Sequence, residues 1–145
     1  METQKRPVTL VIAWVLLLIM GLLMTLGGLG SMYVAYSGIG ESLAGVSSQK
    51  LAELSPGLPT EIKARRATAA FYATSCGLFV IWISTAAFRN RQKWAWFALL
   101  CSLGIGAVLS ILRIPLLDHR AGAEPAGLIL IVLIIALGIS YKDFR

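Results

Sequence analysis

Residues 7 to 40 read PVTLVIAWVLLLIMGLLMTLGGLGSMYVAYSGIG, and no residue between Arg6 and Glu41 is charged. As one helix this run would be about 51 Å long at about 1.5 Å per residue, whereas the hydrocarbon core of a bilayer is about 30 Å thick. Glycines lower the helix propensity toward the end of the run. The run therefore predicts a first transmembrane helix over about 7–35, either tilted or projecting into the headgroup region.

The residues before this run, METQKR, resemble the basic start of a signal peptide. The apolar stretch that follows is much longer than the apolar region of a signal peptide, and it lacks a convincing small-residue cleavage site. We therefore interpret the first segment as a signal anchor that is retained in the membrane.

Three further runs contain no charged residue: 67–88, 94–112 and 125–141. The last is short, so we extend its helix to about 122–141. Each run has about the length needed to cross a bilayer, and none shows the alternation of a barrel strand. The sequence predicts an all-α, polytopic membrane protein: a four-transmembrane-helix bundle that forms a single membrane domain over 1–145, with one surface loop.

The composition agrees with a membrane protein. Of the 145 residues, 57% are apolar and 14% are charged, whereas an ordinary soluble domain has about 45 to 50% apolar and about 25% charged residues. A soluble domain of this size has too little interior to hide such an excess, so most water-soluble folds are excluded. The net charge of +6 then reports orientation and headgroup contact, and we expect membrane lipids rather than nucleic acid as partners.

The basic residues give the orientation. If the N-terminus is cytoplasmic, seven basic residues lie inside and six lie outside. The turn at 89–93 holds three basic residues in five positions, and short loops count most in the positive-inside rule. We predict that both termini are cytoplasmic. The inside set is Lys5, Arg6, Arg89, Arg91, Lys93, Lys142 and Arg145, and the outside set is Lys50, Lys63, Arg65, Arg66, Arg113 and Arg120.

The one sizeable loop covers about 36–66. Its middle predicts a short amphipathic helix, with Ser48 as a candidate N-cap and Leu51 and Leu54 on one side. After the Pro56-Gly57 stop, the second helix is expected to begin near Glu61. The loop is either a functional element on the membrane surface or a plain connector.

Small residues recur every four positions along the second and third predicted helices. Such residues let helices approach closely in lipid. They indicate packing within the bundle, with a dimerisation face as the alternative. The fourth helix is mostly bulky and is expected to face lipid or a partner. The two packing stripes are Ala69, Ala73 and Gly77, and Ala98, Ser102, Gly106 and Ser110.

The string Arg89-Asn-Arg-Gln-Lys-Trp-Ala-Trp-Phe97 resembles the basic-then-aromatic turn of many small bacterial four-helix integral membrane proteins, some of them broadly DoxX-like in shape. The resemblance implies a helical bundle in a bacterial cytoplasmic (inner) membrane. It covers about nine residues and transfers no active site.

The centres of the predicted helices contain no Asp, Glu, Lys, Arg or His. Proton-coupled transporters and ion pumps usually place an ionisable group at membrane depth, so this pattern counts against them. Cys76 and Cys101 are interpreted as inert thiols, with a disulfide or redox chemistry as alternatives. With one histidine and no Cys-x-x-Cys pair, we expect no metal site and no cofactor.

A polar constellation flanks the connection between the third and fourth helices. Because Pro115 is expected to end the helix that carries Arg113, these groups are predicted to gather at the same surface as the basic start of the second helix. They form either a charged mouth for a phosphate-bearing headgroup or a solvated interfacial loop. The candidate contacts are Lys63, Arg65, Arg66, Arg113, Asp118, His119 and Arg120.

These observations favour a non-enzymatic function. The leading hypothesis is a small accessory or scaffold protein that binds lipid or a membrane-protein partner through its outer loop and fourth helix, or assembles as a homo-oligomer. The alternative is a small transporter, channel or lipid-handling protein that uses the basic mouth. An intramembrane enzyme ranks third, because the chain lacks a recognisable nucleophile, metal set or cofactor motif.

Overall fold

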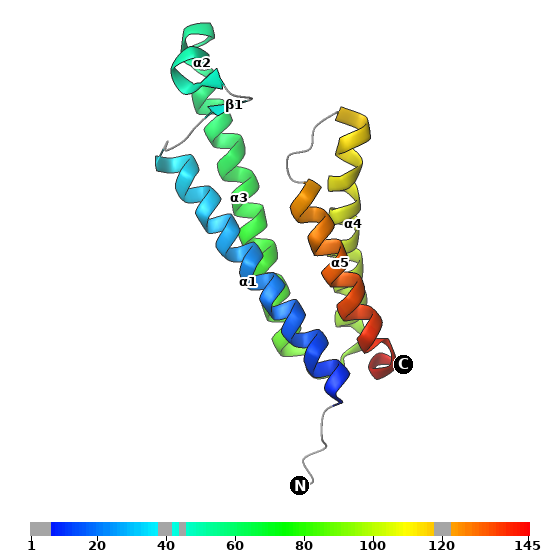
Figure 1. Cartoon of the computed structure of the whole chain (residues 1–145). Coiled ribbons are helices and arrows are strands. Elements are labelled where there is room, and N and C mark those ends of the chain that lie inside the picture. The colour runs from blue at the N-terminus through cyan, green and yellow to red at the C-terminus, as the bar shows by residue number, and fades with distance from the viewer. Residues whose placement is uncertain (1–6, 38–41, 44–45, 118–122) are drawn as a thin grey trace. The chain divides into compact units, whose positions relative to one another are not determined.

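The computed structural model describes residues 7–37, 42–43, 46–117 and 123–145. Within these ranges the chain is helical except for one short hairpin and a few turns (Figure 1). In an apolar environment such as lipid, long apolar runs favour helices, because a helix satisfies all of its backbone hydrogen bonds within one segment.

Four long helices account for most of the described chain. They are α1 (Val8–Ser37), α3 (Leu58–Ile83) with the π-helical turn η1 (Ser84–Phe88), α4 (Lys93–Leu117), and α5 (Ala123–Ser140) with the 3₁₀ turn η2 (Tyr141–Phe144). In the described residues these four are long and apolar enough to cross a membrane. The predicted all-α class with four candidate spans is therefore confirmed.

The chain divides into two compact units, which we describe separately. Unit 1 contains Met1–Gly21 and Phe79–Arg145, and unit 2 contains Leu22–Leu78. The first half of α1 thus belongs to unit 1 and its second half to unit 2. Helix α3 is also divided: it lies in unit 2 up to Leu78 and in unit 1 from Phe79.

In unit 1, α4 packs along α5. Its buried positions recur every four residues, at 95, 99, 103 and 107, and α5 buries Leu133, Ala136 and Leu137. This spacing is the apolar stripe expected of a helix with one packed face. The indole nitrogen Nε1 of Trp96 also donates a hydrogen bond to the Leu137 carbonyl at 3.1 Å, which links the two helices directly.

In unit 2, the second half of α1 approaches α3 closely. Gly28 is buried, and a Cβ atom at this position would lie 2.7 Å from the Thr74 backbone nitrogen and 3.0 Å from the Ala70 carbonyl oxygen. Nearer the start of α3, Arg66 Nε donates to Ser31 Oγ at 3.5 Å. A small residue at the crossing therefore permits a contact that a side chain would prevent.

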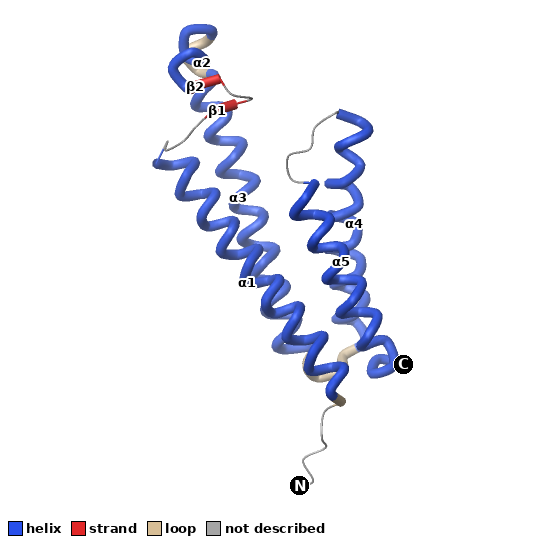
Figure 2. Tube along the Cα trace, viewed as in Figure 1, coloured by secondary structure: helices blue, strands red, loops and turns tan. Residues whose placement is uncertain are grey.

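The segment between α1 and α3 contains structure that the sequence did not indicate. Strands β1 (Ser42–Leu43) and β2 (Val46–Ser47) form an antiparallel pair (Figure 2). Helix α2 (Ser48–Leu54) follows at once, so the N-cap residue is Ser47 and the proposed cap at Ser48 is wrong. Leu51 is 7% exposed and Leu54 is 78% exposed, so the two leucines do not share one buried side.

Two expected helix ends are also wrong. Helix α3 begins at Leu58 rather than near Glu61, with Pro59 in its first turn, where proline is tolerated because its missing N–H would be unpaired in any case. Helix α4 continues through Pro115 to Leu117. Proline removes one hydrogen bond from the preceding turn, but membrane helices often tolerate this loss, and the helix ends two residues later.

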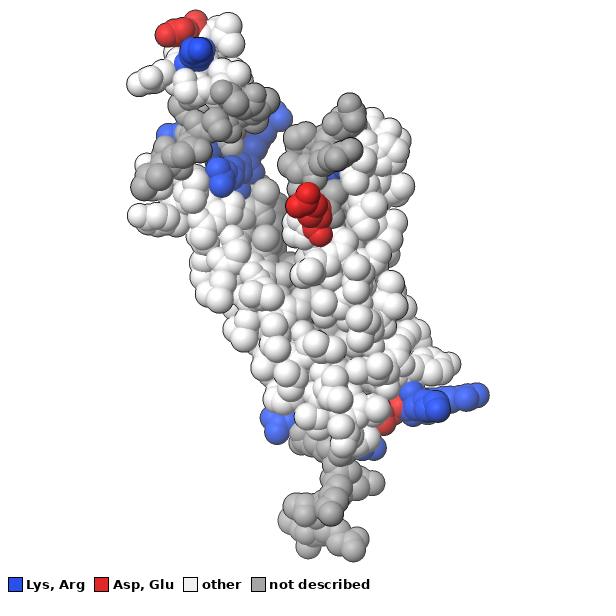
Figure 3. All heavy atoms as spheres, viewed as in Figure 1, with Lys and Arg blue, Asp and Glu red and all other residues white. Residues whose placement is uncertain are grey.

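Charged side chains lie at the ends of the helices in each unit, and the helix surfaces between them are uncharged in the view of Figure 3. This distribution is what a bilayer requires, since charges are costly in hydrocarbon and favourable among headgroups. The helix ends are therefore where a polar site is to be sought.

Candidate functional site

The beginning of α1 and the end of α5 meet at one end of unit 1. Thr9 Oγ1 donates to the Asp143 carboxylate oxygen Oδ2 at 2.8 Å. Lys93 Nζ, at the start of α4, donates to the Arg145 carbonyl at 3.0 Å. Turn η2 thus contacts both α1 and α4. We call this region the basic–aromatic end, defined by Thr9, Trp14, Ser84, Phe88, Arg89, Arg91, Lys93, Trp96, Lys142, Asp143, Phe144 and Arg145.

Aromatic rings fill the interior of the basic–aromatic end. Phe144 of η2 is buried, and its ring centroid lies 4.7 Å from that of the fully buried Phe88. Trp96 meets the Tyr141 ring edge-on, with 6.1 Å between centroids. Such pairs stabilise packing beyond the area they bury. The C-terminal turn is therefore held by a small aromatic core as well as by polar contacts.

A cation–aromatic contact joins α1 to the turn that follows η1. The guanidinium carbon Cζ of Arg89 lies 5.0 Å from the centroid of the Trp14 ring. Arg89 is exposed, while Trp14 is half-buried. Tryptophan is the most favourable aromatic partner for a cation, so this contact fixes the guanidinium above α1.

Two buried polar atoms of this region have no hydrogen-bond partner within the described residues, Trp14 Nε1 and Ser84 Oγ. Several hydroxyls of the other helices donate to the carbonyl four residues earlier, as Ser102 and Ser140 do at 2.6 and 2.7 Å. Ser84 opens the π-helical turn η1, in which the Arg89 amide donates to the Ser84 carbonyl at 3.0 Å. Buried polar groups without a partner are rare and call for an explanation.

The surface of the basic–aromatic end is strongly positive. Five basic side chains of the described residues are exposed here, against the single half-buried acid Asp143. Part of this positive surface is visible at the lower end of Figure 3. An excess of this kind attracts anionic headgroups. The five are Arg89, Arg91, Lys93, Lys142 and Arg145.

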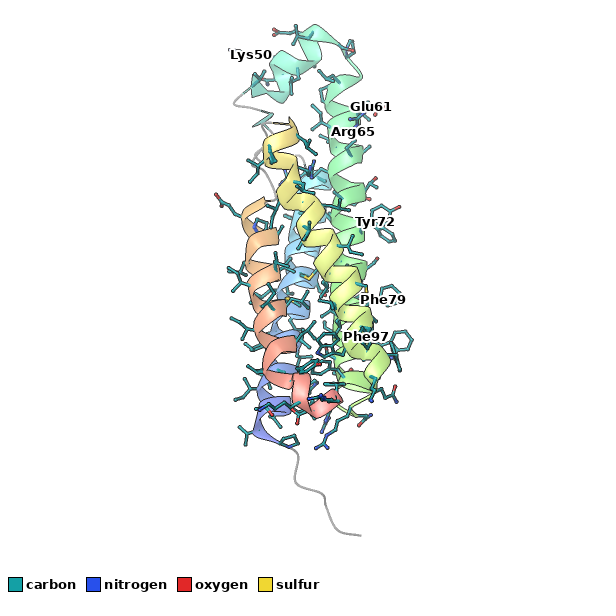
Figure 4. The ribbon with its side chains drawn as sticks, turned by 90° about the vertical axis from the view of Figure 1, so that its right-hand side faces the viewer. Lys50, Glu61, Arg65, Tyr72, Phe79 and Phe97 are labelled. Atoms are coloured by element: carbon teal, nitrogen blue, oxygen red, sulfur yellow. The ribbon has the colours of Figure 1, made fainter. Side chains whose placement is uncertain are left out.

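The residues of the predicted mouth are divided between the two units and the part of the chain outside the described residues. Arg65 and Arg66 are exposed and Lys63 is half-buried, all near the start of α3 in unit 2. In Figure 4, Arg65 projects from the same side of α3 as Glu61 and Tyr72. Arg113 is exposed on α4 in unit 1. Asp118, His119 and Arg120 lie outside the described residues, so a shared mouth stays a prediction.

The predicted packing stripes lie partly on buried surface. On α3, Ala69 is exposed, Ala73 is half-buried and Gly77 is buried. On α4, Ala98 and Ser110 are half-buried, whereas Ser102 and Gly106 are exposed. The buried positions of α4 are instead Ala95, Leu99, Leu103 and Ala107, so the small-residue stripe is offset from the buried one.

The described residues contain no cluster of three or more His, Cys, Asp or Glu side chains that could hold a metal ion. Cys76 is half-buried and Cys101 is exposed, and both are free thiols.

Sequence reasoning missed the contact between Trp14 and Arg89. From the sequence, Arg89 is an orientation signal and Trp14 is assigned no functional role, although Trp and Arg are both typical of the membrane interface. Their common preference for the interface was the feature of the sequence that could have linked the two residues. Their separation along the chain gave no reason to place them together.

No family model matches the chain, and no curated protein or solved structure is significantly similar to it. The function must therefore be argued from the residues themselves.

Proposed function

We propose that this chain is a small integral membrane protein with four spanning helices and both termini on the cytoplasmic side of a cytoplasmic membrane. In this proposal it serves as a non-enzymatic accessory or scaffold protein. It binds lipid or a membrane-protein partner through the segment between α1 and α3 and through α5. The observation that carries the proposal is the exposed apolar face of α5.

Helix α5 has two different faces. Leu133, Ala136 and Leu137 are buried, whereas Leu128, Ile131 and Ile134 are each 60% exposed. The exposed positions recur every three residues and form a continuous apolar surface of branched side chains. Lipid tails are as apolar as leucine, so a partner helix gains from shape and packing at such a surface rather than from hydrophobicity alone.

The segment before α3 offers a second apolar contact. Leu54 at the end of α2 is strongly exposed, beside the exposed charged residues Lys50 and Glu53. A large apolar side chain among charges suits the headgroup region or a protein partner better than water. The segment thus supports the same function as the exposed face of α5.

Membrane insertion is tested first. Extraction of membranes with alkaline carbonate should leave the full chain in the pellet, because four spanning helices are not released by charge disruption. Release into the supernatant would overturn the whole proposal.

Partner binding is tested by photo-crosslinking in cells. A photoreactive amino acid at position 131 or position 54 should give a discrete protein adduct. The matched control is position 105 on α4, because Ile105 is also 60% exposed but lies on a helix outside the proposed surface. Equal adducts from all three positions, or a strictly monomeric protein that retains no lipid in mild detergent, would refute the accessory function.

A further inference from the structure

We infer that Arg89, held over Trp14, forms a binding site for the phosphate of an anionic phospholipid at the basic–aromatic end. This inference concerns unit 1 alone. It depends on membrane insertion but not on the accessory function of α5.

The geometry supplies one exposed donor group for a phosphate and a ring that holds it in place. Arg89 is exposed, and its guanidinium is fixed 5.0 Å from the centroid of the Trp14 ring. A guanidinium binds phosphate oxygens through paired, charge-assisted hydrogen bonds. The indole Nε1 of Trp14 is buried without an acceptor among the described residues. Because this nitrogen is buried, Trp14 serves the site by holding the guanidinium in place rather than by donating to the phosphate.

The surroundings favour a lipid as the source of the phosphate. Trp82 and Phe79 precede Arg89 on α3 and are 65% and 57% exposed, with 6.4 Å between their ring centroids. These rings offer apolar surface to an acyl chain on the hydrocarbon side of the guanidinium. Four neighbouring basic side chains against one acid make a net anionic headgroup more favourable than a zwitterionic one.

Ser84 is not assigned to this site. Its side chain is fully buried, one turn deeper than Arg89, and its hydroxyl has no exposed path to a headgroup. Its part is to place Arg89, because the Ser84 carbonyl accepts the Arg89 amide hydrogen at 3.0 Å.

Native mass spectrometry of the full chain in mild detergent tests the site. We expect phosphatidylglycerol to give a first adduct at lower concentration than phosphatidylcholine with the same acyl chains. The variant Arg89→Gln should weaken this phosphatidylglycerol adduct about tenfold, since the charged hydrogen bonds of the guanidinium to the phosphate are lost. Trp14→Phe keeps a ring but holds the guanidinium less strongly, so it should weaken the adduct by about threefold.

Arg91→Gln is the matched control, because it removes the same charge from the same exposed turn. We expect it to weaken the adduct by less than about twofold. Equal losses for Arg89→Gln and Arg91→Gln would show a diffuse surface charge and overturn the site. Equal binding of the two lipids, or loss of the lipid adduct on adding inorganic phosphate, would also overturn it.

Folding is controlled separately. Circular dichroism should show unchanged helicity in each variant. If Arg89→Gln does not fold, Arg89→Lys is tested instead, because lysine keeps the positive charge but lacks the planar guanidinium group. It should bind phosphatidylglycerol more weakly than the parent chain, and parent-like binding would overturn the assigned role of the guanidinium.

Discussion

Gly28 lets α1 and α3 approach closely within unit 2. A Cβ at this position would lie 2.7 Å from the Thr74 backbone nitrogen, so Gly28→Ala must push the two helices apart. We expect the free energy of unfolding to fall by about 1 to 3 kcal/mol, measured as a lower Tm by circular dichroism in a fixed detergent.

Gly30 is the matched control for Gly28. A Cβ at Gly30 would meet nothing within 4 Å, so Gly30→Ala should leave the Tm unchanged or raise it, because alanine favours the helix. Equal losses for the two variants would mean that the close approach at Gly28 does not contribute to stability.

Ser84 and Ser140 are both fully buried but differ in hydrogen bonding. The Ser140 hydroxyl donates to the Ala136 carbonyl at 2.7 Å, whereas the Ser84 hydroxyl has no partner within the described residues. Ser84→Ala removes an unpaired buried group and should leave the free energy of unfolding unchanged or higher, while Ser140→Ala should lower it by about 1 kcal/mol. Thermal unfolding of both variants checks this difference, and a larger loss for Ser84→Ala would show that its hydroxyl does bind a partner.

At the scale of elements, one side chain links α4 to α5. Trp96 Nε1 donates to the Leu137 carbonyl at 3.1 Å, so Trp96→Phe removes the hydrogen bond and keeps most of the ring. We expect the free energy of unfolding to fall by about 1 kcal/mol. Denaturation by increasing SDS, followed by circular dichroism, measures the change.

Trp94 provides the comparison within the same helix. Its Nε1 donates to Gln92 Oε1 at 2.7 Å, a contact within one turn that joins no two helices, and its ring is exposed. Trp94→Phe should therefore cost less than Trp96→Phe. If the order is reversed, the interfacial position of Trp94 contributes more than the link between the helices.

The existence of the elements follows from the sequence more reliably than their ends do. Charge-free runs are a property of whole segments, and each of the four predicted spans has a helix. Pro115 is expected to stop a helix, yet α4 passes through it. The loss of one backbone hydrogen bond at the proline is outweighed by helix formation along the rest of the apolar segment. The hairpin Ser42–Leu43 with Val46–Ser47 has two residues in each strand, too few to leave a recognisable alternation.

At the scale of the molecule, the sequence indicated where charges lie but not which side chains meet. Spacing places a residue on a helix face, whereas the contact between Trp14 and Arg89 depends on how separate helices pack. The same limit applies to the stripe from Ala98 to Ser110, which is offset from the buried face of α4. Small residues mark where close approach is possible, and the neighbouring helix determines which of them are used.

The predicted orientation of the whole molecule rests on the turn at 89–93. With the termini inside, seven basic residues lie on that side and six on the other. Replacing Arg89, Arg91 and Lys93 with Gln leaves seven minus three, or four, against six, which reverses the bias of the positive-inside rule. We expect a substantial fraction of this triple variant to insert in the inverted orientation.

Single cysteines at positions 55 and 92 report this inversion, in a chain that also carries Cys76→Ala and Cys101→Ala. In spheroplasts of cells that express the parent orientation, a membrane-impermeant maleimide should label Ser55→Cys and should reach Gln92→Cys only after permeabilisation. In the triple variant, Gln92→Cys should become labelled without permeabilisation. An unchanged labelling pattern would contradict this prediction. Because the remaining charges favour the inverted orientation, other features, such as the length of α1 or the segment between α1 and α3, would then fix the orientation.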